Sequence, residues 1–229
     1  GNDELEQKLQ QVCQENDITL VGPNCLGAIN PEISMNASFG HLMPKLGHVA
    51  FMSQSGALCT AVLDYAQDLG VGFSKFISIG NKADVDELKL IRYLAEDDQT
   101  KVILMYAEEL QNAPEFIETI KEINQGPNPK PVIVLKSGRT EAGAGAIASH
   151  TGSLAGGDAA YNALFDQAGM IRAHSIKDLF DYAQVFARND LAHVDNVAII
   201  TNAGGPGVLT TDEVVDNGLK MAEISSETK

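Results

Sequence analysis

The chain has 229 residues, which is enough for one large α/β domain or for one domain with pieces of others. Hydrophobic residues make up 44% of it and charged residues 21%, as is ordinary for a globular protein, so the composition argues against a disordered chain. The 31 acidic residues outnumber the 16 basic ones and give a formal charge of −15, which would repel a nucleic-acid backbone and excludes nucleic acid as an expected partner.

The N-terminal part of the chain indicates one helix and one strand. Apolar residues recur at helical spacing over residues 3–16, and the apolar run at 18–21 favours a short strand. A single helix and a single strand cannot close a hydrophobic core, and Pro and Gly punctuate residues 31–47 as in a connector. We therefore expect residues 1–44 to be the end of one domain followed by a connector.

From residue 45 onward, short apolar runs alternate with helical stretches. Four strands are predicted, at residues 48–52, 73–79, 101–106 and 131–135. Helices are predicted between them, at residues 56–69, 85–96 and 113–124. Strands that are apolar almost throughout and are joined by helices are typical of a parallel sheet buried on both faces. The fold class is therefore predicted to be α/β, with a doubly wound parallel sheet.

The alternation continues toward the C-terminus. Two further helices and a short fifth strand are predicted, at residues 157–168, 175–187 and 170–172. After a polar stretch the cycle starts again, with a strand at 196–200 and a helix at 207–217. We expect one domain over residues 45–190 and the truncated beginning of a second, similar domain over residues 191–229.

Polar groups follow several of the predicted strands. In a doubly wound sheet, ligands bind at the carboxyl ends of the strands, where the strand order reverses. With the order 2-1-3-4-5, this point lies between the first and the third strand. Ser53–Gly56 follow the first strand, Glu108 and Glu109 the third, and Lys136–Arg139 the fourth. Because Gly56 opens a helix whose first amides are free, we expect an anion site at this edge.

Each of these groups also has a purely structural interpretation. Ser55 could serve only as the cap of its helix, which is the commoner use of serine at such a position. The two glutamates could be solvated charges, and Lys82, after the second strand, could be an ordinary surface lysine. Neither a GxGxxG nor a Walker sequence is present, so the sequence carries no nucleotide-binding fingerprint.

His150 has a setting that favours chemistry. It lies in Ser149–Gly156, a stretch of small residues, after a Gly- and Ala-rich run that is long for a connection. Neutral imidazole is a good nucleophile toward phosphorus near neutral pH, because its reference pKa is about 6.5. We expect a phosphate-carrying histidine at position 150, preceded by a poorly ordered segment at residues 139–149. The alternative is a structural role, which is commoner for a lone histidine.

The cysteines and the absence of long apolar stretches indicate the compartment. Cys13, Cys25 and Cys59 lack the number and spacing of a disulfide framework or a zinc site, so we expect no metal site and a reducing, cytoplasmic environment. No stretch approaches the roughly 20 apolar residues of a membrane span. The first residues lack the basic and apolar parts of a signal peptide, so we expect neither an anchor nor a membrane partner.

Six short motifs stand in order along the chain. They are Val21–Gly27, Ser53–Ala57, Ser78–Asp84, Ser137–Arg139, Ser149–Gly156 and Thr201–Gly207. In sequence and in order they resemble the motifs of the NDP-forming acyl-CoA synthetases, a family related to the succinyl-CoA synthetase α subunit. The resemblance covers essentially the whole chain. It implies that residues 1–44 include the end of a CoA-binding domain, that 45–190 are a flavodoxin-like domain, and that 191–229 begin a second one.

The resemblance also implies a reaction. Acyl-CoA, phosphate and ADP would be interconverted with the free acid, CoA and ATP, through an acyl phosphate and a phosphohistidine at His150. CoA and ADP or ATP with Mg²⁺ would serve the full enzyme, and none is expected to bind tightly to this chain. An ATP-grasp domain or subunit would be the partner, and a homo-oligomer is compatible with the family. Without these parts, we expect the chain to be inactive.

Site residues follow from the same motifs. Glu108 matches an acidic position of the family and would accept the proton on the second ring nitrogen of His150. Glu109 departs from the pattern, since the family usually has glycine there. Residues expected to bind the phosphate are Ser53, Gln54, Ser55, Gly56, Asn81, Lys82, Lys136, Ser137, Gly138, Arg139, Thr151 and Gly152.

Two other functions remain open on the sequence. The same architecture occurs as an acyl-CoA-sensing regulatory module in synthetase-like protein lysine acetyltransferases, where loss of the histidine would be expected. A flavin-binding flavodoxin is the third interpretation. It is disfavoured because the loops considered lack aromatic residues that could stack on a flavin ring.

Overall fold

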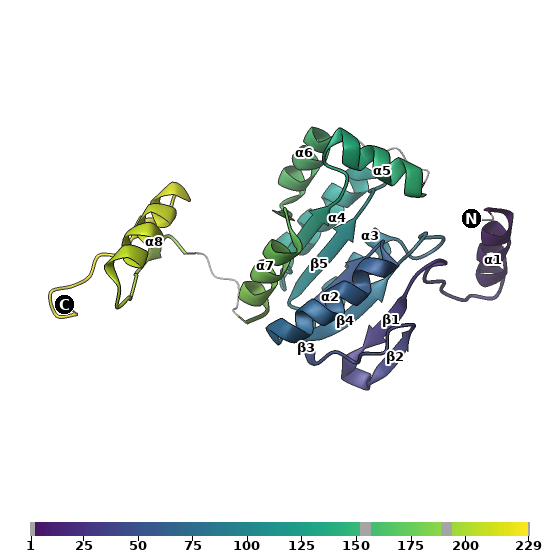
Figure 1. Ribbon diagram of the computed structural model, residues 1–229, viewed down its shortest axis with the longest axis horizontal. Coiled ribbons are helices and arrows are strands. Elements are labelled where there is room, and N and C mark those ends of the chain that lie inside the picture. The colour runs from purple at the N-terminus through teal and green to yellow at the C-terminus, as the bar shows by residue number, and fades with distance from the viewer. Residues whose placement is uncertain (1–2, 152–156, 189–193, 229) are drawn as a thin grey trace. The chain divides into compact units, whose positions relative to one another are not determined.

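The computed structural model forms two compact units, Gly1–Asn189 and Asp190–Lys229, and each is described by itself (Figure 1). The structure describes residues 3–151, 157–188 and 194–228, but not the side chains of 3 and 147–151. Of the described helices, none combines the length and the apolar composition that crossing a membrane requires.

A seven-stranded sheet with the order β2-β1-β4-β3-β5-β6-β7 forms the centre of the first unit. The strands are β1 (Gly27–Asn30), β2 (Met35–Ser38), β3 (Leu46–Ser53), β4 (Phe73–Ser78), β5 (Val102–Ala107), β6 (Val132–Lys136) and β7 (Ile171–Ala173). Strands β3 to β7 pair in parallel. Their order, β4-β3-β5-β6-β7, is the predicted 2-1-3-4-5, so the strand order reverses between β3 and β5 as expected.

Helices cover both faces of this sheet. They are α2 (Gly56–Leu69), α3 (Glu87–Glu96), α4 (Ala113–Gln125), α6 (Asp158–Ala168) and α7 (Ile176–Arg188). One buried cluster joins the sheet to α3, α4 and α6, and another joins it to α2 and α7 (Figure 1). The predicted doubly wound α/β fold is therefore confirmed. Burial on both faces explains why the central strands are apolar at nearly every position.

Helix α2 shows how the local sequence defines an element. The Ser55 hydroxyl accepts a hydrogen bond from the Leu58 amide at 3.3 Å, which caps the first turn. Gly70 ends the helix with a φ of +66°, a conformation that glycine adopts without strain. Between these ends, the helix buries Cys59, Val62, Leu63 and Ala66 on the face that meets the sheet.

The N-terminal segment differs from its prediction. Helix α1 (Asp3–Glu15) is present, but residues 18–21 form no strand; the Leu20 amide instead donates to the Asp84 carboxylate at 2.9 Å. Strand β2 lies within the expected connector, and the short 3-10 turn Pro31–Ile33 joins it to β1 in a hairpin. Strand β1 pairs antiparallel with β4 and buries Ile29, so it extends the sheet.

The segment before His150 also differs from its prediction. Helix α5 (Glu141–Thr151) occupies the stretch that we expected to be irregular. The Thr140 hydroxyl accepts a hydrogen bond from the Gly143 amide at 3.1 Å, and the Ala144 amide donates to the Thr140 carbonyl at 2.8 Å. Alanine has the highest helix propensity, and here it outweighs the cost of the interspersed glycines.

The second unit contains a small β-α-β arrangement. Strands β8 (Asn196–Val197) and β9 (Lys220–Met221) pair in parallel, and α8 (Gly204–Asp216) lies between them in the chain. The helix begins three residues earlier than predicted. Pro206 falls in its first turn, where a missing amide hydrogen costs nothing, so the Gly- and Pro-rich turn continues directly into the helix.

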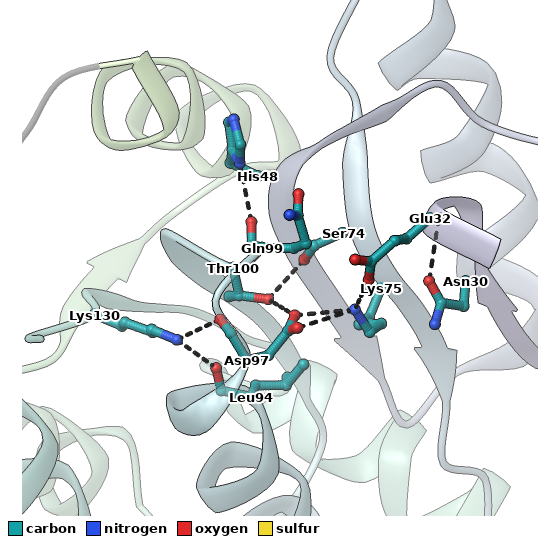
Figure 2. A network of polar contacts seen from close by, with 10 residues as sticks. All are labelled: Asn30, Glu32, His48, Ser74, Lys75, Leu94, Asp97, Gln99, Thr100 and Lys130. Atoms are coloured by element: carbon teal, nitrogen blue, oxygen red, sulfur yellow. Dashed lines mark hydrogen bonds and ion pairs between the residues drawn. The ribbon is translucent and has the colours of Figure 1, made fainter.

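Buried charges lie near the amino ends of the central strands (Figure 2). The Lys75 Nζ lies 3.1 Å from the Asp97 carboxylate and 3.4 Å from that of Glu32. The Thr100 hydroxyl donates to Asp97 at 2.6 Å. Lys130, which is 1% exposed, donates to the carbonyls of Leu94 and Asp97 at 3.0 and 2.6 Å. Both ammonium groups thus have oxygen acceptors inside the protein.

Candidate functional site

The first group of predicted site residues lies at the carboxyl end of β3. The buried Ser53 hydroxyl accepts from the Ser55 amide at 3.0 Å and donates to the Ser55 carbonyl at 2.9 Å. These bonds fix the turn that leads into α2. The amides of Gly56 and Ala57 have no carbonyl ahead of them within the helix, so the turn presents donors at a helix N-terminus.

Gln54 connects β3 to the end of β5. Its Oε1 accepts hydrogen bonds from the amides of Glu108 and Glu109, at 2.7 and 3.1 Å. Its Nε2 donates to the Glu109 carbonyl at 2.7 Å and to the Glu87 carboxylate. The Gln54 side chain uses all of its donors and acceptors within the protein. The structure therefore places Gln54 as a support for the rim rather than as a free phosphate ligand.

Lys82 is similarly engaged. Its Nζ lies 3.0 Å from the Glu87 carboxylate and 3.8 Å from that of Glu109, and its side chain is 9% exposed. The backbone of Lys82 has a φ of +59°, which is uncommon outside glycine. Glu109, the departure from the family pattern, thus faces a lysine, and this pairing offsets its charge next to the proposed phosphate site.

Lys136 is the buried cation at the end of β6. It is 2% exposed, its Nζ donates to the Ser137 carbonyl at 2.5 Å, and the same atom lies 4.4 Å from the centre of the Tyr161 ring. Burial and the neighbouring Arg172 guanidinium lower the pKa of Lys136 below its usual range. Among the described residues, no carboxylate lies within ion-pair distance of this ammonium group.

The ends of β5 and β6 meet beside Lys136. The Ser137 amide donates to the Ala107 carbonyl at 3.0 Å, which brings Ser137 and Gly138 next to the residues that follow β5. Burial and the nearby Glu108 carboxylate raise the pKa of Tyr106, against a hydrogen bond with Ser137 that lowers it. Three of the predicted groups, after β3, β5 and β6, therefore converge on one rim.

Two predicted ligands have other partners. The Arg139 guanidinium lies 3.0 Å from the Nδ1 of His174, in an exposed position. The side-chain amide of Asn81 donates from Nδ2 to the Glu6 carboxylate at 2.6 Å, and its Oδ1 accepts from the side chain of Asn24 at 3.2 Å. Both side chains are exposed enough to exchange these partners for a ligand. Among the described contacts, neither side chain bonds to Lys136.

The position of His150, the predicted phosphate carrier, is described only for its backbone. His150 and Thr151 lie in the last turn of α5, with side chains outside the described part, and Gly152 lies outside the described residues. The segment from β6 to α6 begins and ends on the rim, because β6 ends at Lys136 and α6 begins at Asp158. The proposed contact between Glu108 and the His150 ring stays a prediction.

Sequence reasoning missed several residues of this rim. Glu87 is a 4% exposed carboxylate that holds both Gln54 and Lys82. A glutamate on the apolar face of a predicted helix is a detectable signal, since such residues are seldom buried without partners. Arg172 on β7 pairs with Asp158 at 2.5 Å, and its Nε is buried without a hydrogen-bond partner. A lone arginine in a three-residue strand gave no such signal.

The described residues of this rim indicate neither a metal-ion site nor a cysteine nucleophile. Within residues 3–146, 157–188 and 194–228, no group of three His, Cys, Asp or Glu side chains could hold a metal ion. Cys59 lies close by on α2, but burial raises its thiol pKa to about 11, against lowering hydrogen bonds with Ser53 and Ser78. A thiol with that pKa is a poor nucleophile near neutral pH.

Comparison with known proteins gives a consistent family. Residues 46–186 match the family model described as "Succinyl-CoA ligase like flavodoxin domain". Acetate–CoA ligase [ADP-forming] I of Archaeoglobus fulgidus is 46% identical over 224 residues, which are 98% of this chain and 32% of the relative. Acetate–CoA ligase [ADP-forming] II subunit alpha of Pyrococcus furiosus is 43% identical, over 97% of this chain and 48% of the subunit.

A solved structure agrees with these relatives. It is the dinucleotide-forming acetyl-coenzyme A synthetase 1 of Ca. Korarchaeum cryptofilum in complex with phosphate and ADP, with a TM-score of 0.89 and 38% identity. The match covers 98% of this chain and 48% of that one, so the chain spans about a third to a half of the relatives it matches. The chain therefore belongs to the NDP-forming acyl-CoA synthetase family, and residues 46–186 form its succinyl-CoA ligase-like flavodoxin domain.

Proposed function

We propose that this chain is the phosphohistidine-carrying part of an ADP-forming acid–CoA ligase. The complete enzyme would interconvert acyl-CoA, phosphate and ADP with the free acid, CoA and ATP. The observation that carries the proposal is the convergence, on one rim, of the α2 N-terminus, the buried Lys136 and the segment that bears His150. Family membership and the names of the relatives support the same reaction.

The reaction would proceed in three balanced steps. An oxygen of phosphate attacks the thioester carbonyl carbon, the C–S bond breaks, and CoA leaves as the thiol after taking up a proton. A nitrogen of His150 then attacks the phosphorus of the acyl phosphate, and the P–O bond to the acyl group breaks to release the carboxylate. Finally, a β-phosphate oxygen of ADP attacks the phosphohistidine, and the P–N bond breaks to give ATP and free His150.

The described residues would bind and position the phosphoryl group. The amides of Gly56 and Ala57 and the ammonium of Lys136 would stabilise its negative charge, which grows in the transition state. Glu108 would accept the proton on the second ring nitrogen of His150 and so select its tautomer. Gln54 and Lys82 would hold the rim in place through their bonds to Glu108, Glu109 and Glu87.

The remaining parts of the reaction would lie elsewhere. Residues 1–44 would continue from a CoA-binding domain, 45–190 would be the flavodoxin-like domain, and 191–229 would begin a second one. An ATP-grasp domain or subunit would supply the nucleotide site, with Mg²⁺ on the nucleotide. Alone, the chain would bind these cofactors weakly and turn over no substrate.

A phosphorylation experiment tests the proposal. In the complete ligase supplied with ATP labelled at the γ-phosphate, acid-labile and base-stable label should appear on the wild type and be lost in His150→Ala. His48→Ala is the matched control, because the exposed His48 ring forms a hydrogen bond with the Gln99 carbonyl at the opposite end of the sheet, so its loss should leave the label intact (Figure 2). Unchanged labelling of His150→Ala would refute the relay and favour an acyl-CoA-sensing module instead.

A further inference from the structure

Glu87 is a buried carboxylate to which the proposed reaction assigns no task of its own. It is the first residue of α3 and is 4% exposed. The Lys82 Nζ lies 3.0 Å from its carboxylate, and both side chains are almost fully buried. The same Nζ lies 3.8 Å from the Glu109 carboxylate, so one ammonium group connects the start of α3 to the loop after β5. Burying an ion pair costs about as much as the attraction returns, so stability alone does not account for it.

The Gln54 side chain lies between two acceptors and two donors. The acceptors, on the Nε2 side, are the Glu87 carboxylate and the Glu109 carbonyl, the latter at 2.7 Å. The donors, on the Oε1 side, are the amides of Glu108 and Glu109, at 2.7 and 3.1 Å. A glutamine side chain has an oxygen that only accepts and a nitrogen that only donates, so its two ends are not interchangeable here.

Only one orientation of the Gln54 amide satisfies these partners. The reversed orientation would place Oε1 against the Glu87 carboxylate and the Glu109 carbonyl, and Nε2 against two N–H groups. Because a carboxylate accepts hydrogen bonds and does not donate them, Glu87 excludes this reversal. The Gln54 backbone amide also donates to the Tyr106 carbonyl at 3.3 Å, so main chain and side chain together hold the end of β5.

The orientation of Gln54 bears on the proposed chemistry because Glu108 follows β5 directly. We propose that Glu87 is a positioning residue, which fixes the direction of the Gln54 amide and thereby the place of Glu108. The inference rests on the proposed function, to which it adds a residue of α3. In that function Glu108 accepts a proton of the His150 ring, and a misplacement of about 1 Å at such a contact can slow a reaction about 100-fold.

Hydrogen exchange measures the orientation of Gln54 directly. Glu87→Gln keeps the size and shape of the side chain but lets it donate as well as accept. The Gln54 amide can then reverse, and the amides of Glu108 and Glu109 lose their acceptor. In the complete ligase, we expect hydrogen–deuterium exchange at these two amides, read by mass spectrometry, to become about 10-fold faster. Glu96→Gln makes the same change at an exposed position of α3 and should leave the exchange unchanged.

The rate of phosphorylation provides the functional readout. In a single turnover of the complete ligase with ATP labelled at the γ-phosphate, label should reach Glu87→Gln about 10- to 100-fold more slowly than the wild type. The ATP concentration that gives half the maximal rate should change by less than about twofold, because the nucleotide would bind in the ATP-grasp part. A rate within about threefold of the wild type, in a variant whose amides exchange faster, would overturn the positioning role.

An exchange of the two groups separates positioning from folding. Gln54→Glu alone sets a second carboxylate against Glu87 and should also slow phosphorylation. When Gln54→Glu and Glu87→Gln are combined, a donor again faces an acceptor, and an oxygen at position 54 still accepts from the Glu108 amide. The combined variant should phosphorylate at least about 10-fold faster than Gln54→Glu. No recovery in a combined variant that resists urea as the wild type does would contradict the proposal.

The two proposals fail in different ways. Loss of label in His150→Ala, together with equal amide exchange in the wild type and Glu87→Gln, would overturn the positioning role and leave the relay intact. Faster exchange in Glu87→Gln with full labelling of His150→Ala would remove the phosphohistidine, and with it the part of Glu87 in that step. The orientation of Gln54 by Glu87 would then stand as a structural finding.

Discussion

Both ends of the central sheet bury lysine side chains, but the ammonium groups at the two ends have different hydrogen-bond acceptors. At the amino ends of the strands, Lys75 pairs with Asp97 and Lys130 donates to two carbonyls that end α3 (Figure 2). At the carboxyl ends, Lys136 has one carbonyl and the face of the Tyr161 ring. The first arrangement is complete without a ligand, whereas the second, within the part of the chain that the structure describes, leaves donor capacity for an anion.

This difference shows which property marks a functional lysine. Burial lowers the pKa of both Lys130 and Lys136, so the direction of the pKa shift does not separate them. The two lysines differ in the hydrogen-bond acceptors of their ammonium groups. Lys130 closes the end of a helix, where carbonyls lack intrahelical partners. Lys136 lies instead where the ends of β5 and β6 meet, with the Ser137 carbonyl as its acceptor. The supply of acceptors around a buried ammonium is therefore more informative than its pKa.

Breaking the amino-end cluster should produce the largest effect. In Lys75→Met, the Asp97 carboxylate loses its cation while it stays largely buried. Burial raises the pKa of Asp97, and hydrogen bonds from Thr100 and Lys75 outweigh this and lower it, so removing Lys75 takes away part of the compensation. We expect a loss of about 3–5 kcal/mol in the free energy of unfolding, measured by urea denaturation.

The matched control for that experiment is an exposed pair of the same kind. Lys177 lies 2.5 Å from Asp181 one turn along α7, with both side chains more than half exposed. Lys177→Met should change the free energy of unfolding by less than about 1 kcal/mol. If Lys75→Met were equally mild, the amino-end cluster would not be a structural ion network, and the contrast between the two ends of the sheet would disappear.

The carboxyl-end lysine should show the opposite balance between stability and activity. In Lys136→Met, the protein loses a cation–π contact but also the cost of burying an ammonium group, so the free energy of unfolding should change by only about 1 kcal/mol. Formation of phosphohistidine in the complete ligase should slow by about 100-fold or more, as for loss of one preorganised donor. A rate within threefold of the wild type would remove Lys136 from the phosphate site.

Much of the fold and part of the rim were predictable from the sequence. The apolar strand runs and the intervening helices predict the parallel sheet, and the reversal of strand order brings the residues after β3, β5 and β6 together. The Ser55 cap and the serine-rich turn are local signals that the structure confirms. These features depend on short stretches of chain, in which the sequence pattern and the backbone geometry are directly linked.

The features that were missed depend on distant parts of the chain. Glu87 and Gln54 are 33 residues apart in sequence, and nothing near either residue indicates the other. The expected irregular segment before His150 is helical because alanine propensity prevails over glycine. Strand β2 lies in the stretch that we expected to be a connector, because the pairing of the β1–β2 hairpin with β4 through β1 is a tertiary contact that local composition does not encode. The local sequence pattern thus predicts which residues lie on the rim, whereas long-range contacts decide which of its charged side chains are paired within the protein.

The smallest expected effect concerns alkaline pH, and it sharpens the description of Lys136. Burial, with Arg172, lowers the pKa of Lys136 in the folded protein, although Asp158, Glu108 and Glu109 raise it in part. In the unfolded chain this pKa returns to about 10.5. Between the two values, the unfolded chain binds more protons at this position than the folded protein, so the unfolding free energy rises with pH.

Comparing wild type with Lys136→Met isolates this contribution, because Lys130 and all other titrating groups are common to both proteins. Below the lowered pKa, the wild type bears the full cost of burying an ammonium group. As pH rises toward 10.5, this cost decreases because the folded protein loses the proton. The unfolding free energy of the wild type should therefore increase relative to that of the variant by an amount on the order of 1 kcal/mol or less. Urea unfolding at a series of pH values measures the difference. A difference that stays constant from neutral to alkaline pH would mean that Lys136 titrates like an exposed lysine, which its burial beside Tyr161 does not allow.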